Sequence, residues 1–97
     1  MKPVKALDIS KVCEITSKYP QAHGVPVCIG CPESIGIDNL NKPDWGDAVE
    51  VMRDELPVFH ACGVTPQNVL MMSGISFAIT HSAGHMFVSD LPSDATF

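Results

Sequence analysis

The stretch from residue 57 to residue 91 constrains the fold most, because proline and glycine separate its apolar runs where secondary structure would begin or end. Residues 57–62 alternate and lead into a glycine, which predicts a strand entering a turn. Thr65 occupies an expected N-cap position and Pro66 the first helical position, and Gly74 follows the last apolar residue. A short helix is therefore predicted between Thr65 and Gly74.

Two further strands are predicted after this helix. Residues 77–81 are rich in branched and aromatic side chains, residues 82–84 are turn-forming, and residues 86–89 are again apolar. A strand, a helix and a strand in so few residues favour a right-handed crossover between parallel strands. The predicted fold class is α/β, with α+β as the alternative: a short mixed sheet with a βαβ unit and flanking helices.

The rest of the chain predicts shorter elements around that unit. Asp8 precedes apolar residues at helical spacing, which indicates a helix that ends before Pro20, with Leu7 and Val12 packing across its start. The other expected elements are an edge strand over residues 25–29, a helical turn opening at Pro32, a loop anchored by Trp45 and a strand over residues 48–52. The expected core is Val69, Leu70, Met72, Ile75, Phe77 and Ile79.

Composition limits the chain to one core and excludes several partners. Its 97 residues are 45% hydrophobic, so we expect a single domain over residues 1–97, with residues 92–97 as a tail that has little reason to be ordered. A net charge of −5 and only six Lys plus Arg argue against nucleic acid and anionic membrane, which both need a basic face. No apolar run suits a membrane span or a signal sequence, so a cytoplasmic location is expected.

The loop into the predicted helix is a candidate anion site. It runs from a strand to a helix start, where free backbone N–H groups and the helix dipole favour a carboxylate or phosphate. Pro66 has no N–H, so Gln67 and Asn68 would supply the donors. The alternative is that Thr65 only caps a surface helix, which is the commoner role of such a residue.

His81 and His85 are the candidate catalytic pair. Their spacing would put two ligands on one face of a helix, but the Ser-Ala-Gly between them predicts a turn instead. Across a tight turn the two rings flank one opening, where imidazoles can exchange protons near neutral pH. Asp90 could orient one ring or simply end the last strand. The alternative is two solvated turn histidines, and His23 and His60 are expected to be structural.

The cysteines offer a different site. Cys28 and Cys31 are spaced like half of a zinc site or like a dithiol at a helix start. His60 and Cys62 lie two apart on one predicted strand, so they could share a face and complete a four-ligand site. In a cytoplasmic chain, thiols or metal ligands are expected rather than disulfides. The alternative is that these cysteines are small core residues, because a single CxxC is a weak signal.

Four blocks of sequence together resemble one family. In chain order they are ITSKYPQAHGVPVCIGCPESIGI, DWGDAVEV, PVFHACGVTPQ and FAITHSAGHMFVSDL, and the GVTPQ and ITHxxGHM patterns are specific. Over nearly all of residues 1–92 the chain resembles the C-terminal part of the hydro-lyase family that includes D-glutamate cyclase. The resemblance implies a fragment of a larger three-layer α/β domain. It also implies either an absent N-terminal half or a homo-oligomer, since the missing half should leave apolar surface uncovered.

The activity implied by the resemblance is removal of water from a small carboxylic or amino acid, and for D-glutamate cyclase the closure of D-glutamate to 5-oxo-D-proline. That reaction needs an anion clamp, a base for the amine and an acid that assists the release of hydroxide. No cofactor or metal is expected, and an animal member would lie in the mitochondrial matrix. The expected residues are His81, His85 and Asp90 for proton exchange, and Gly63, Thr65, Gln67, Thr80 and Gly84 for substrate binding.

The sequence departs from the family pattern at two places. Cys28 and Cys31 stand where the family usually has His and Asp, which argues against a zinc role for the CxxC pair. His60 stands where the family usually has an aromatic residue, so a pocket-wall role for this position is in doubt. Two alternatives to an enzyme remain: a non-catalytic module that binds a small ligand or assembles with a partner, and a zinc or thiol module.

Overall fold

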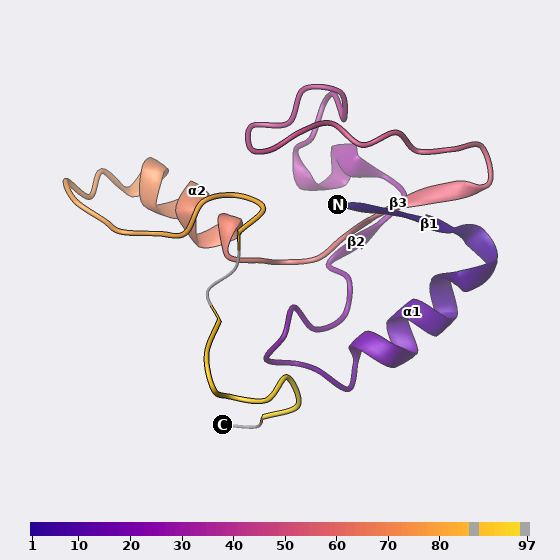
Figure 1. Ribbon diagram of the computed structural model, residues 1–97. Coiled ribbons are helices and arrows are strands. Elements are labelled where there is room, and N and C mark those ends of the chain that lie inside the picture. Colours follow the sequence, from indigo (N-terminus) through magenta and orange to yellow (C-terminus); the bar gives the residue numbers. More distant parts are fainter. Residues whose placement is uncertain (86–87, 96–97) are drawn as a thin grey trace.

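A three-stranded antiparallel sheet joins the N-terminal segment to the middle of the chain (Figure 1). The computed structural model describes residues 1–85 and 88–95. The strands are β1 (Lys2–Lys5), β2 (Cys28–Ile29) and β3 (Glu55–Phe59), and β3 lies in the centre. The carbonyl oxygen of Pro57 in β3 accepts a hydrogen bond from the Gly30 amide at 2.9 Å. Proline is tolerated in this central strand because it needs only to accept there.

Helix α1 (Ile9–Thr16) confirms the first predicted helix, although its start differs in detail. A 3-10 turn, η1 (Ala6–Asp8), precedes it, and Asp8 occupies the N-cap position without a side-chain capping hydrogen bond. The predicted packing of Leu7 on Val12 is wrong, because Leu7 is 94% exposed. The Thr16 hydroxyl donates to the Val12 carbonyl at 2.7 Å, a bond back to the preceding turn of the helix.

The middle of the chain is mostly loop. The predicted helical turn is confirmed as η2 (Pro32–Ile35), which ends at Gly36 with a φ of 81°. The predicted edge strand is also confirmed, but β2 spans only two residues of it. The predicted strand over residues 48–52 is wrong, because that segment pairs with no described strand. Trp45 is 40% exposed and does not anchor the loop.

Helix α2 (Val64–Ser73) confirms the second predicted helix. Its N-cap is Gly63 rather than Thr65, and it ends as predicted at Gly74, which has a φ of 75°. The predicted strand over residues 77–81 is wrong, because these residues form no ladder. Of the predicted strand over residues 86–89, residues 86 and 87 lie outside the described residues and residues 88 and 89 are not in a strand.

The predicted fold class, a mixed α and β fold with a short sheet, is confirmed. The predicted parallel crossover is wrong, since every strand pair in the described part of the chain is antiparallel. Strand propensity reflects the fit of side chains onto a half-buried pleated surface, and residues 77–81 have no neighbouring strand to provide one. Within the described residues, no helix is long and apolar enough to cross a membrane.

The core is small and lies at β3 rather than at α2. The buried residues are Pro57, Val58, Phe59 and Gln67. Most of the predicted core is wrong: Val69, Met72, Ile75, Phe77 and Ile79 are exposed, and only Leu70 is half-buried.

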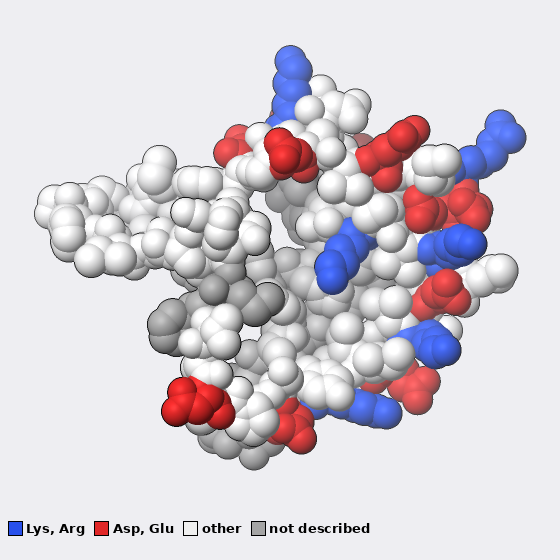
Figure 2. Space-filling view, in the orientation of Figure 1, with Lys and Arg blue, Asp and Glu red and all other residues white. Residues whose placement is uncertain are grey.

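The segment of α2 projects from the rest of the molecule and carries no formal charge. The sequence has no Asp, Glu, Lys or Arg from Leu56 to Ser89. In Figure 2 the charged side chains are spread over the rest of this face, at the top, the right and the bottom, while the lobe that contains α2 is white. Its exposed side chains include Val69, Met72 and Phe77, and large apolar surface of this kind is rare on monomeric proteins. The homo-oligomer or N-terminal half that would cover it remains a prediction.

Val58 should contribute most to stability, because it is the only fully buried large side chain among the described residues, at 1% exposure. Val58→Ala is expected to lower the free energy of unfolding by about 2 kcal/mol, since it removes buried methyl groups and leaves a cavity. Urea unfolding followed by circular dichroism measures the change. Val25→Ala is the matched control, because Val25 is 50% exposed. An equal loss in both variants would contradict a core centred on β3.

Candidate functional site

A cavity of about 810 Å³ lies at the start of α2 and brings together residues from distant parts of the sequence. None of the described residues that line it is Asp, Glu, Lys or Arg, so its titratable groups are three imidazoles and one thiol. The lining residues that matter for chemistry are His23, Cys62, Gly63, His81, Gly84 and His85. The predicted histidine pair and the predicted helix start therefore meet at one cavity.

The His81 ring packs directly against Gly63. A Cβ atom added to Gly63 would overlap Nε2 of that ring, so only glycine leaves room for it. Nδ1 of His81 lies 2.9 Å from the Ser82 carbonyl oxygen. A carbonyl oxygen only accepts, so Nδ1 carries the proton, and in the neutral ring Nε2 keeps a lone pair, which faces Gly63. A ligand can reach Nε2 only when the His81 ring moves away from Gly63.

His85 is held on the other side of a tight turn. Its backbone N–H donates to the Ser82 carbonyl at 3.0 Å, and its Nδ1 lies 3.2 Å from the Ala83 carbonyl oxygen. Gly84 has a φ of 79°, which glycine adopts without a steric penalty. The turn therefore presents both rings to the cavity, with each Nδ1 bonded to the backbone.

Two residues predicted to bind substrate have structural roles at the start of α2. The Thr65 hydroxyl accepts a hydrogen bond from the Cys62 amide at 3.2 Å, and Thr65 does not line the cavity. Gln67 is 6% exposed, and its side-chain amide donates to the His81 carbonyl oxygen. Gln67 therefore connects α2 to the histidine turn.

Asp90 and Thr80 lie outside the cavity lining, and both are exposed. The described hydrogen bonds place backbone carbonyls, rather than Asp90, on Nδ1 of the two rings. The orientation of His81 and His85 thus comes from the turn itself. A role for Asp90 or Thr80 in the reaction stays a prediction.

His23 is a cavity residue that sequence reasoning assigned to a structural role. Its Nδ1 lies 2.9 Å from the Ala61 carbonyl oxygen, while Nδ1 of His60 lies 3.1 Å from the Gly24 carbonyl oxygen. These two contacts connect the turn before β2 to the end of β3. His23 has a φ of 73°, the only positive value at a non-glycine position in the described chain. Neither this conformation nor the contact across 38 positions leaves a signal in the sequence.

The proposed zinc ligands do not form a site. The Cys28 thiol donates to the Cys31 carbonyl at 3.3 Å and lies 3.4 Å from the Ser34 hydroxyl. His60 bonds to Gly24, and Cys62 lines the imidazole cavity instead. Among residues 1–85 and 88–95, no group of three or more His, Cys, Asp or Glu could hold a metal ion. The CxxC pair is therefore not half of an assembled four-ligand centre.

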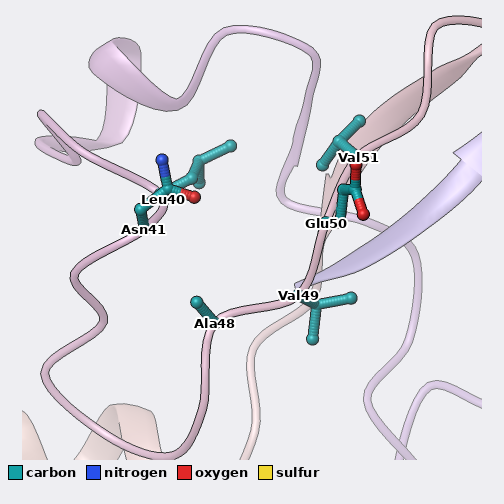
Figure 3. Close-up of a pocket in the computed structure, with 6 residues that line it drawn as sticks. All are labelled: Leu40, Asn41, Ala48, Val49, Glu50 and Val51. Atoms are coloured by element: carbon teal, nitrogen blue, oxygen red, sulfur yellow. The ribbon is translucent and has the colours of Figure 1, made fainter.

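A second cavity, of about 530 Å³, lies in the loop before β3 (Figure 3). The figure shows Leu40, Asn41 and Ala48 on one side and Glu50 with Val51 on the other. This cavity has a single carboxylate and no histidine or cysteine in its lining. Its described lining contains no pair of groups that could act as general acid and general base. The cavity at the start of α2, which His23, His81 and His85 line, is therefore the better candidate.

The hydrogen bond of Gln67 should hold the histidine turn in place. Gln67→Met keeps the length of the side chain but leaves the His81 carbonyl without its donor, so the free energy of unfolding should fall by about 1–2 kcal/mol. Urea unfolding measures the loss. Asn68→Met is the matched control, because Asn68 is the exposed neighbour on the same helix. A loss of the same size in Asn68→Met would contradict the assigned role.

Comparison with known proteins agrees with the resemblance seen in the sequence. The model of a family described as D-glutamate cyclase matches residues 1–90. The chain belongs to that family. The match includes every residue of the predicted site, up to Asp90.

Members of the family related to this chain carry the name "Putative hydro-lyase". The chain is 52% identical over 95 residues to the one from Agrobacterium fabrum strain C58, covering 98% of this chain and 35% of the relative. It is 50% identical over 97 residues to one from Cupriavidus pinatubonensis, covering 100% and 36%. It is 55% identical over 92 residues to one from Paraburkholderia phytofirmans, covering 95% and 36%. The chain thus spans about a third of the length of the curated relatives that it matches.

Proposed function

We propose that this chain carries the proton-transfer groups of a dehydrating lyase that closes D-glutamate to 5-oxo-D-proline. The family supports a lyase of the hydro-lyase type. The observation that carries the finer assignment is the cavity at the start of α2, where His81 and His85 flank one turn beside Gly63.

The reaction needs balanced proton transfers rather than a redox step. The amine nitrogen of D-glutamate attacks the carbon of its side-chain carboxyl group, a C–N bond forms, and a C–O bond breaks. Two protons leave the ammonium nitrogen and two reach the departing oxygen, which leaves as water. A neutral imidazole accepts a proton and an imidazolium donates one, so a pair of imidazoles suits both transfers.

The two rings suit this exchange because hydrogen bonds to the backbone fix which ring nitrogen carries the proton. Each Nδ1 is bonded to a backbone carbonyl, so Nε2 is the nitrogen that accepts or donates, and the His81 ring must move away from Gly63 to do so. In the proposed mechanism, one ring deprotonates the amine and the other protonates the leaving oxygen. The first turn of α2 beside Nε2 of His81 stabilises the negative charge that develops on the carboxyl oxygen.

The direct test is turnover by the chain itself. Incubation with D-glutamate, followed by chiral chromatography, should show 5-oxo-D-proline, and L-glutamate is the matched control substrate. No product above the uncatalysed rate would refute the proposal.

A second candidate is a non-catalytic module that binds a small carboxylate. The observation in its favour is that the chain spans about a third of its relatives and buries few residues. Binding of D-glutamate without any 5-oxo-D-proline would favour this second candidate.

A further inference from the structure

We infer that His23 binds the carboxylate that does not react, in the cavity that His81 and His85 also line. The three rings line the same cavity, although they come from two turns far apart in the sequence. The identity of the ligand rests on the proposed function, whereas the placement of His23 does not. Nothing in the local sequence of His23 assigns it to this cavity.

The backbone fixes which nitrogen of His23 faces a ligand. Nδ1 is bonded to the Ala61 carbonyl oxygen at 2.9 Å, so this nitrogen carries a proton in both charge states of the ring. Nε2 is then the only nitrogen left for a ligand. When the ring is an imidazolium, Nε2–H donates a charge-assisted hydrogen bond, which is stronger than a neutral one.

His23 is also held in an unusual backbone conformation. Its φ of 73° lies in the left-handed region, where histidine, asparagine and aspartate are the most enriched residues after glycine. The hydrogen bond from Nδ1 to the Ala61 carbonyl holds the ring and leaves Nε2 for a ligand.

The described lining of the cavity favours a small anion because it contains no acidic side chain. None of the described lining residues carries a carboxylate that would repel an anion, and none is Lys or Arg. Among these residues only the imidazoles can carry positive charge, and Cys62 is the one other titratable side chain that they include. D-glutamate has two carboxylates, one of which remains intact during cyclisation. With His81 and His85 exchanging protons, His23 is the imidazole available to hold it.

The test measures binding of glutarate, a dicarboxylate that lacks the amine and cannot cyclise. Titration of the full chain, followed by NMR of the imidazole protons, should shift the signals of His23, His81 and His85. His60 is an internal control, because its ring bonds to Gly24 and does not line the cavity.

His23→Asn separates binding from structure. Asparagine tolerates a positive φ, and its amide can donate to Ala61 in place of Nδ1, but it has no group at the position of Nε2. Glutarate should bind about 10- to 100-fold more weakly to this variant, the loss expected for one hydrogen bond to a charged group. His60→Asn, the same change outside the cavity, should leave the affinity unchanged. In turnover assays, His23→Asn should raise KM for D-glutamate while kcat changes little.

The outcomes separate this inference from the proposed function. Glutarate binding that is weakened by His23→Asn supports the anion site, even if the chain forms no 5-oxo-D-proline and the proposed reaction fails. Unchanged affinity in His23→Asn would overturn the inference, as would an equal shift of the His60 signals. The absence of any glutarate binding to the wild-type chain would overturn it as well.

Discussion

Replacing His81 by asparagine is expected to lower the turnover of D-glutamate by about 10²- to 10⁴-fold, the usual contribution of a general acid or base. The amide of the introduced asparagine can still donate to the Ser82 carbonyl that Nδ1 of the ring now contacts. It offers no group at the position of Nε2 that exchanges a proton. Formation of 5-oxo-D-proline by purified wild-type and variant chains measures the loss.

Two measurements show whether that loss is chemical. The free energy of unfolding of His81→Asn should stay close to the wild-type value, because the ring is only half-buried and its backbone hydrogen bond can be replaced. His60→Asn is the matched control, since the His60 ring makes a similar bond to the Gly24 carbonyl and lies outside the cavity. If His81→Asn keeps turnover within about threefold of wild type, His81 does not act as a general acid or base.

Local signals in the sequence predicted the elements whose ends are set locally. Gly74 ends α2 in a left-handed conformation, and Pro32 opens η2, because each residue restricts its own backbone angles. Strands depend on a partner instead. β1 was missed because Lys2–Lys5 contains a proline and two lysines, and only its pairing with β3 makes it a strand. Residues 77–81 have strand-forming side chains but no such partner among the described strands.

The sequence predicted the part of the candidate site that lies on one turn, which carries His81 and His85. It did not predict His23, which reaches the site through a long-range contact. The spacing of His81 and His85 around Gly84 predicted that both rings flank one opening, and both line one cavity. Gly63 lines the cavity and lies against the His81 ring, and its predicted role in substrate binding stays a prediction. His23 joins the site through Ala61, at a separation that no local pattern records.

Adding a side chain at Gly63 is expected to reduce turnover, because the His81 ring occupies the space that the side chain would need. Gly63→Ala should lower the free energy of unfolding by at most about 1 kcal/mol, because the new methyl group would displace the His81 ring, which is half-buried and can move. Turnover of D-glutamate should fall by about 10²-fold, since a small misplacement of a reacting group has that effect. Backbone strain is not the cause, because Gly63 has a φ of −61° and a ψ of −19°, which alanine adopts readily.

A double-mutant cycle with His81→Ala isolates the contact between Gly63 and the ring. Once the ring is removed, alanine at position 63 has no clash, and Gly63→Ala should instead stabilise the chain by about 0.4–1 kcal/mol by restricting the unfolded state. Gly30→Ala is the control, because Gly30 has a φ of 93° and no neighbour within 4 Å of an added Cβ. Its cost is conformational strain, so it should be equal with and without the His81 ring. If Gly63→Ala costs the same free energy with and without the His81 ring, the ring does not pack against Gly63. The proposed contact between the histidine turn and the start of α2 would then be refuted.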